Sequence, residues 1–151
     1  MDLNKEDERL MREALKEARR AFEMDEVPIG AVIVCDGIII ARAYNYTEHL
    51  NDVTAHAEMQ AITSAANNLG GKYLPECTLY VTIEPCVMCA GALFWAQIGR
   101  IVYGAGDPKR GYSMISSGLL HPRTKISNGI LEEECSQLMK TFFEGKRREG
   151  K

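Results

Sequence analysis

The sequence predicts an α/β protein organised as a three-layer α/β/α sandwich, with helices on both faces of one mixed sheet. Three observations predict this fold class. An apolar stripe recurs at helical spacing near the N-terminus, Asp36-Gly37 separates two runs of β-forming residues, and residues 77–104 read strand, helix, strand. A tight turn favours an antiparallel pair, whereas a strand–helix–strand order favours parallel pairing with a right-handed crossover, so we expect a mixed sheet.

The first helix is expected from about Lys5 to Asp25. Its apolar residues recur at i, i+4, i+7 and i+11 and form one stripe, which comprises Met11, Leu15, Ala18 and Phe22. Val27-Pro28 ends this helix, because proline disfavours helical backbone at the residue before it.

Two strands are expected next, over Ile29–Cys35 and Ile38–Asn45. The Asp36-Gly37 pair between them is a strong signal for a type I′ hairpin turn, because both central residues of that turn need positive φ.

A second helix is expected from near Thr54 to Leu69, ended by Gly70-Gly71. Helical spacing predicts that its buried stripe consists of Met59, Ile62, Ala66 and Leu69.

The second half of the sheet is expected from Cys77–Ile83, which alternates and is rich in β-formers, and from Arg100–Gly104. Between them, Pro85 opens a helix that runs to about Gln97 and is apolar all round, so both of its faces should be covered. Residues 105–125 are the least regular part. A last helix is expected over Leu131–Phe143.

Composition indicates one ordinary domain, which we expect to span residues 1–151. Hydrophobic residues make up 46% of the chain and charged residues 26%, values that argue against disorder. The longest apolar run, Cys86–Ala96, is well short of the ~20 residues that cross a bilayer, and the N-terminus is polar and acidic. We therefore expect a cytoplasmic protein without a membrane segment.

Charge is unevenly distributed along the chain. Residues 1–99 contain 8 Lys and Arg against 15 Asp and Glu, whereas residues 100–151 contain 10 against 6. A basic C-terminal third can attract a polyanion, although a solvated helix face accounts for the same charges. The five cysteines include one Cys-x-x-Cys pair and no regular framework, which favours reduced thiols and a metal site over disulfides.

Two short motifs carry the candidate chemistry, His56-Ala57-Glu58 and Pro85-Cys86-Val87-Met88-Cys89. Each lies at a predicted helix start that follows a strand, where α/β sheets build their sites. Cys86 and Cys89 are three residues apart and share a helix face, and a helix N-terminus favours the thiolate form. With the imidazole of His56 they form a three-ligand set suited to zinc, which leaves a fourth position for water.

Glu58 lies two residues after His56, and in the first turn of a helix both side chains can lean toward the same mouth. A carboxylate beside a zinc-activated water can take its proton and deliver protons to a ring nitrogen and a leaving amine. His-x-Glu followed by Pro-Cys-x-x-Cys is the zinc nucleobase-deaminase signature. The motifs therefore indicate hydrolytic removal of an exocyclic amine from a base.

Other interpretations of these motifs remain open at this point. The Cys-x-x-Cys pair on its own is also typical of redox proteins. A fourth protein ligand would make the zinc structural, and the candidates for it are Cys35, Cys77, Cys135, His49 and His121.

Beyond its motifs, the chain resembles the bacterial tRNA-specific adenosine deaminases of the cytidine deaminase-like superfamily. The resemblance covers nearly the whole chain. It is carried by Val27–Val32, Thr54–Met59, Glu84–Ala92, Ile98–Ala105 and the ending from Gly129 to Phe143.

The resemblance implies a five-stranded sheet, a homodimer, and one Zn²⁺ per subunit bound by His56, Cys86 and Cys89 with water or hydroxide as the fourth ligand. It implies proton transfer by Glu58, and conversion of adenosine to inosine at the wobble position of a tRNA anticodon stem-loop. The positions that match the family's substrate contacts are Asn45, Val27, Pro28, Ile83, Asp107, Lys109, Lys146 and Arg147.

Three departures from the family keep alternatives open. Val53 replaces the usual proline, Phe94-Trp95-Ala96 is bulkier and similar to guanine deaminases, and Glu144 stands where a basic residue is common. The first alternative is a deaminase of a free base or nucleotide, such as guanine, cytosine or deoxycytidylate. The second is a catalytically silent, zinc-stabilised RNA-binding subunit.

Overall fold

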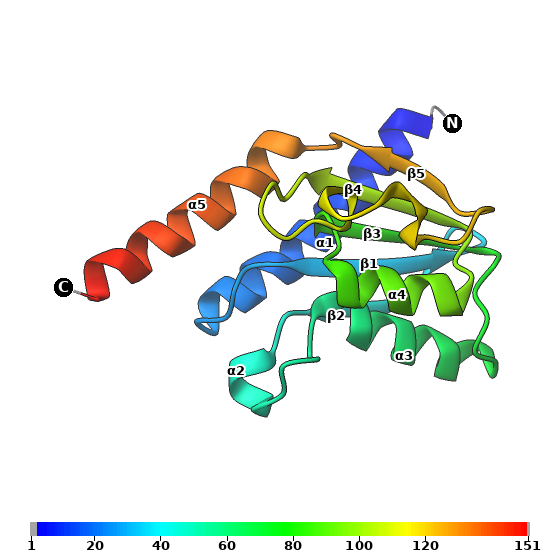
Figure 1. The fold of residues 1–151 in the computed structure, drawn as a ribbon, viewed down its shortest axis with the longest axis horizontal. Helices are drawn as coiled ribbons and strands as arrows, with labels where there is room; N and C mark the ends of the chain where they lie inside the picture. Colours follow the sequence, from blue (N-terminus) through cyan, green and yellow to red (C-terminus); the bar gives the residue numbers. More distant parts are fainter. Residues whose placement is uncertain (1–2, 151) are drawn as a thin grey trace.

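The computed structural model describes residues 3–150, and residues 1, 2 and 151 of the expected domain lie outside the described residues (Figure 1). One five-stranded mixed sheet forms the middle layer, in the order β2-β1-β3-β4-β5. Its strands are β1 Gly30–Cys35, β2 Ile38–Tyr44, β3 Cys77–Ile83, β4 Arg100–Ala105 and β5 Lys125–Asn128. β1 pairs antiparallel with β2 and β3, whereas β3–β4 and β4–β5 are parallel. The expected mixed, five-stranded sheet is thus confirmed.

Helices cover both faces of this sheet. The α-helices are α1 Leu3–Glu23, α2 Thr47–Leu50, α3 Ala57–Leu69, α4 Val87–Ala96 and α5 Glu132–Glu149, and two short 3-10 turns are η1 Tyr112–Met114 and η2 Ser117–Leu119. α3 and α4 lie side by side on one face, while α1 and the start of α5 pack on the other, and the far end of α5 projects past the sheet (Figure 1). Within residues 3–150, no helix has the length and apolar character needed to span a bilayer.

Strand alternation divides the buried residues between two cores. Ala31 and Ile33 of β1 face α3 and α4, whereas Val32 and Val34 face α1. This pattern is the period-2 alternation of a strand buried on both sides. The predicted three-layer sandwich is therefore confirmed.

Local predictions hold where turn chemistry is specific. Asp36 and Gly37 have φ values of 52° and 74°, as a type I′ turn requires. Gly70 ends α3 with φ 73°. The last helix is longer than predicted, since α5 continues to Glu149 through a charged segment that carries no apolar stripe.

The predicted buried stripe of α3 is wrong. Its buried residues are Ala57, Glu58, Ala61 and Ala65, whereas Leu69 is exposed and Met59, Ile62 and Ala66 are only partly buried. The alanines lie four residues apart and pack in the same core as three alanines of β1 and β2, namely Ala31, Ala41 and Ala43. Small residues on both sides allow a close approach of helix and sheet, and the larger Ile62 packs only at the margin of this core.

A buried ion pair joins α1 to the opposite half of the sheet. Asp7, which is 2% exposed, accepts hydrogen bonds from Arg100 Nη1 and Nη2 at 2.9 and 2.8 Å and from Tyr80 Oη at 2.8 Å. Burial alone would raise the pKa of Asp7, but the hydrogen bonds from Arg100 and Tyr80 outweigh it and hold this pKa below 3.8. The charged form of Asp7 therefore stabilises the fold above its ordinary pKa, and that contribution is lost as the pH falls through the lowered value.

Asp7→Asn should destabilise the protein at neutral pH by up to about 3–5 kcal/mol, because Arg100 then loses its charged partner. Urea unfolding of both proteins at stepped pH measures the difference in the free energy of unfolding. We expect this difference to shrink below about pH 4, where the unfolded wild-type chain takes up a proton at Asp7 while the folded protein still keeps Asp7 charged. A difference that stays constant down to about pH 3 would contradict the lowered pKa.

Candidate active site

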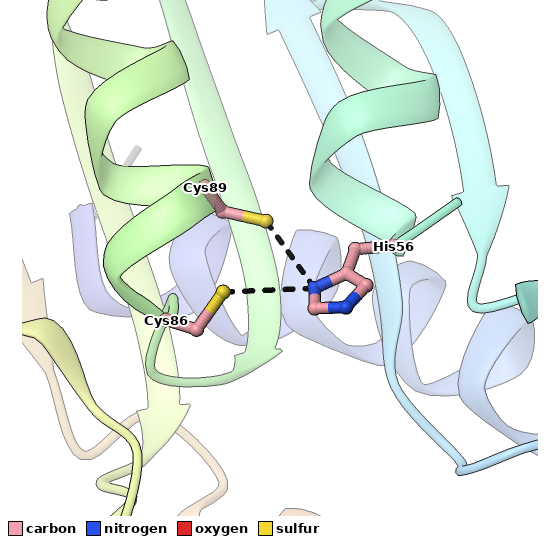
Figure 2. A group of neighbouring side chains, drawn as sticks. All are labelled: His56, Cys86 and Cys89. Atoms are coloured by element: carbon pink, nitrogen blue, oxygen red, sulfur yellow. Dashed lines mark hydrogen bonds between the residues drawn. The ribbon is translucent and has the colours of Figure 1, made fainter. Parts of the chain in front are cut away.

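The two motifs meet at neighbouring helix starts. His56 is the N-cap residue of α3 and Cys86 is the N-cap residue of α4, both with extended backbone, while Cys89 lies in the first turn of α4. The predicted helix starts at Thr54 and Pro85 were therefore early by a few residues. Because α3 and α4 run side by side, their N-terminal ends bring the three side chains together (Figure 2).

The three potential ligand atoms form one compact group. His56 Nδ1 lies 3.6 Å from Cys86 Sγ and 3.5 Å from Cys89 Sγ, and all three atoms lie within 4.8 Å of one another (Figure 2). Nitrogen and thiolate ligands that bind one zinc ion tetrahedrally lie about 3.6 Å apart, given their usual bond lengths. The donor set and the spacing therefore fit a zinc ion.

The electrostatics of the group also favour a cation. Hydrogen bonds from Cys89 and His56 lower the pKa of Cys86 to about 4. The hydrogen bond to Cys86, together with burial, raises the pKa of Cys89 well above its usual value. The Cys86 thiolate thus forms readily, and its negative charge opposes deprotonation of Cys89. A bound divalent cation would allow both sulfurs to be deprotonated together.

Glu58 lies beside this group, in the first turn of α3, and is 3% exposed. Burial raises the pKa of Glu58 to about 7, and the charge of His56 opposes that rise. A carboxyl group that exchanges a proton near neutral pH is suited to general acid–base work. The geometry expected from the His-x-Glu spacing, with both side chains at one mouth, is what the structure shows.

A cleft of about 910 Å³ opens above these residues. His56, Glu58 and Cys86 line its floor. One wall is the loop after β4, residues 106–110, and the other is a face of α5 that includes Ser136, Met139, Lys140, Phe143, Glu144 and Arg147. The residues of the candidate metal group are buried or half-buried, whereas the lysines and arginines that line the cleft are exposed.

Most of the predicted substrate positions line this cleft, namely Asn45, Val27, Ile83, Asp107, Lys109 and Arg147. Two of the predicted residues are not among the lining that the structure describes. Pro28 is buried, and Lys146 instead forms ion pairs with Asp25 at 2.6 Å and Glu149 at 3.5 Å. Lys146 therefore anchors α5 to the segment that follows α1.

The alternative zinc ligands lie elsewhere. Within residues 3–150, the group that could hold a metal comprises only His56, Cys86 and Cys89. Cys35 and Cys77 are strand partners at the opposite end of the sheet, and Cys135 packs in the α1-side core. His49 Nδ1 lies 2.7 Å from Glu26 Oε2, and the ring centroids of His121 and Phe94 are 5.8 Å apart. This arrangement therefore favours a metal site with three protein ligands over one closed by a fourth.

Several cleft residues were not predicted from the sequence, among them Arg110, Lys140, Met139 and Phe143. The helical spacing 136, 140, 144, 147 places one row of side chains on a single face of α5. That signal was obscured because the helix was predicted to end at residue 143.

Comparisons with known proteins agree with this geometry. Residues 5–147 match the MafB19-like deaminase family. The tRNA-specific adenosine deaminase of Agrobacterium fabrum is 49% identical over 89% of this chain and 91% of its own length, and that of Bacillus subtilis is 46% identical over 97% and 94%. A solved structure from a study of A-to-I editing by tRNA:A34 deaminases is 48% identical, covers 86% of this chain and 98% of its own, and superposes with a TM-score of 0.81.

The likeness extends over both motifs, the sheet and the cleft walls, at identities far above those that show a fold alone. The five-stranded sheet has the cytidine deaminase-like arrangement of these relatives. The chain belongs to the MafB19-like deaminases and, within them, to the family of the tRNA-specific adenosine deaminases.

Proposed function

We propose that this protein is a zinc-dependent hydrolase that converts adenosine to inosine at the wobble position of a tRNA anticodon. The observation that carries the proposal is the three-ligand group of His56, Cys86 and Cys89 with buried Glu58 beside it, at the floor of a cleft. The relatives named as tRNA-specific adenosine deaminases support the choice of substrate.

The metal and the carboxylate have separate tasks in this proposal. When bound, zinc acts as a Lewis acid that makes water a nucleophile near neutral pH. Glu58 would pass one proton of that water to the ring nitrogen of the base and the second proton of the same water to the departing amine, as the C–O bond forms and the C–N bond breaks. His56, Cys86 and Cys89 each offer one ligand atom and leave a fourth position for water.

The walls of the cleft suit a nucleic acid. Lys109 and Arg110 border it on one side, and Lys140 and Arg147 on the other, so phosphates on either side of a base can be held. A wobble base lies in an unpaired loop, where turning it out of the stack costs least. Asn45 and Ile83 are buried and Val27 is half-buried in the same lining, and we assign contact with the base itself to these three.

We also propose a homodimer, formed through α4 and η1. Their starts are linked, since the amide of Tyr112, the first residue of η1, donates to the carbonyl of Pro85, two residues before α4, at 2.9 Å. Large apolar side chains are exposed on both and just after η1, namely Val87, Trp95, Met114 and Ile115, with Trp95 75% exposed. Exposed large apolar side chains are favoured at protein interfaces.

The chain is further proposed to act as a single deaminase domain, because α1 and α5, from opposite ends of the sequence, pack on the same face of one sheet. A tRNA substrate would place it in the cytoplasm, where tRNA is used.

Removal of a ligand should remove the metal. We expect Cys86→Ala and His56→Ala to lose both zinc and activity, because two remaining ligands cannot hold the ion. Elemental analysis of the purified variants measures this. Cys35→Ala is the matched control, since this half-buried cysteine lies at the far end of β1, and it should retain zinc. Stoichiometric zinc in Cys86→Ala would contradict the ligand set.

Loss of the carboxylate should separate metal binding from catalysis. Glu58→Ala is expected to retain zinc and the fold but to lose ~10²-fold or more in kcat, because the carboxylate assigned to proton transfer is removed. Zinc content, thermal unfolding and single-turnover rates measure the three properties. Glu76→Ala, which changes an exposed glutamate before β3, should leave all three unchanged. Full turnover by Glu58→Ala would refute its role.

The substrate is tested by incubating the zinc-loaded protein with an anticodon stem-loop that has adenosine at the wobble position and, separately, with free guanine. Nucleoside mass spectrometry should detect inosine in the RNA and no conversion of guanine. Rapid guanine turnover with unedited RNA would reject the tRNA proposal in favour of a free-base deaminase. Zinc binding without turnover of either substrate would favour a silent RNA-binding subunit.

The dimer is tested by sedimentation equilibrium. Trp95→Glu should shift the protein toward monomer, because it places a charge in the proposed interface. Val53→Glu is the control, since Val53 is 84% exposed on the loop before α3 and belongs to neither α4 nor η1. A wild type that sediments as a monomer would overturn the dimer proposal.

A further inference from the structure

Glu84 is a buried carboxylate to which the proposed chemistry gives no role. It is 7% exposed and directly precedes the Pro85-Cys86 pair. Its Oε1 accepts the amide of Asp107 at 3.1 Å, and its Oε2 accepts the amide and the hydroxyl of Ser113 at 3.0 and 2.6 Å. All three of these donors belong to one loop, residues 106–113, which follows β4 and runs into the first two residues of η1.

The same loop is tied to the metal-binding segment through the backbone. The Glu84 amide donates to the Ala105 carbonyl at 2.8 Å, and the Tyr112 amide donates to the Pro85 carbonyl at 2.9 Å. Cys86 and Gly111 form an isolated antiparallel bridge. Backbone contacts therefore hold both ends of the 106–113 loop, and the Glu84 carboxylate lies between them.

Gly111 shows how closely the loop approaches this carboxylate. A Cβ atom at residue 111 would overlap the carboxylate carbon and oxygens of Glu84. Gly111 is also buried, and its amide donates to the Asp107 carbonyl at 2.9 Å. Only glycine permits this approach, so the loop is shaped around the carboxylate.

The middle of the 106–113 loop faces the cleft. Asp107 Oδ1 accepts the amides of Lys109 and Arg110, both at 3.0 Å, and thereby closes a tight turn. Lys109 and Arg110 line the cleft from this turn, and Glu84 itself contributes to the lining. The turn thus carries two cations at a set distance from Cys86.

We propose that Glu84 is a positioning residue that clamps the 106–113 loop against the segment carrying Cys86, so that Lys109 and Arg110 are in place before the RNA arrives. The inference rests on the proposed function, because it assigns the clamp to RNA binding. If the loop is already ordered in the free protein, RNA binding does not have to supply the entropic cost of ordering it. The clamp therefore acts on substrate affinity, whereas Glu58 acts on the chemical step.

Glu84→Gln tests the clamp with little change in shape. A glutamine has one carbonyl oxygen where the carboxylate has two acceptors, so its NH₂ group must face at least one of the loop's amide donors. A buried donor left without an acceptor destabilises the local structure. Glu76→Gln makes the same chemical change at an exposed glutamate and serves as the matched control.

Steady-state kinetics on the anticodon stem-loop distinguish a clamp from a general structural role. For Glu84→Gln we expect KM to rise about tenfold, kcat to change less than about threefold, and zinc to remain stoichiometric. Ser113→Ala removes one of the three donors and should raise KM by a smaller factor. A purely structural role would instead lower the active fraction, with kcat reduced and KM unchanged, and that result would overturn the proposal.

Hydrogen exchange of the zinc-loaded protein provides a readout that does not depend on activity. The amides of Asp107 and Ser113 should exchange faster in Glu84→Gln than in the wild type, while Glu76→Gln should match the wild type. Equal exchange in all three proteins would refute the clamp even if the RNA is edited. If the wild type leaves the RNA unedited, the proposed function fails, and faster exchange at these two amides still supports the clamp.

Discussion

The meeting of two helix starts on one face of the sheet is the constraint on which the rest of this structure depends. His56 and Cys86 both cap their helices with extended backbone, and their side chains converge only because α3 and α4 begin at the same edge. The partial positive charge of two helix N-termini favours thiolates and water-derived anions at that point. Gln60 secures the α3 start, since its side-chain amide donates to the carbonyls of Tyr44 and Ala55 at 2.7 and 3.1 Å.

Buried carboxylates organise the surroundings of this meeting point in different ways. Glu26, which is fully buried, accepts the amides of Glu48 and His49 and the His49 ring, and so holds α2 beside the cleft. Glu84 holds the loop on the other side. Glu58 instead has the Cys89 thiol as a side-chain partner, and burial raises its pKa to about 7. The first two acids are satisfied by fixed donors, and the third remains available for reaction.

Sequence reasoning predicted the parts whose chemistry is specific to few residue types. The Asp36-Gly37 turn, β3 and the His56, Cys86, Cys89 group follow from turn geometry, alternation and metal-ligand spacing. The misses have physical causes. β5 is a short edge strand whose residues are mostly exposed, and α2 has four residues, none of them buried, so neither has an apolar pattern. The buried face of α3 was misjudged because close packing selected alanines over larger side chains. The ion pair of Lys146 with Asp25 joins residues far apart in the sequence, and no local pattern reveals it.

The uneven charge of the chain separates the candidate metal group from the basic residues that line the cleft. The potential zinc ligands and Glu58 lie between residues 56 and 89, in the acidic part, whereas the lysines and arginines that line the cleft come from residues after 105, in the basic part. A substitution on the exposed faces of α5 or the 106–113 loop can therefore alter which molecules are admitted without touching the reactive group. This arrangement allows the potential zinc ligands and Glu58 to be inherited unchanged while the substrate selectivity of the cleft diverges between lineages.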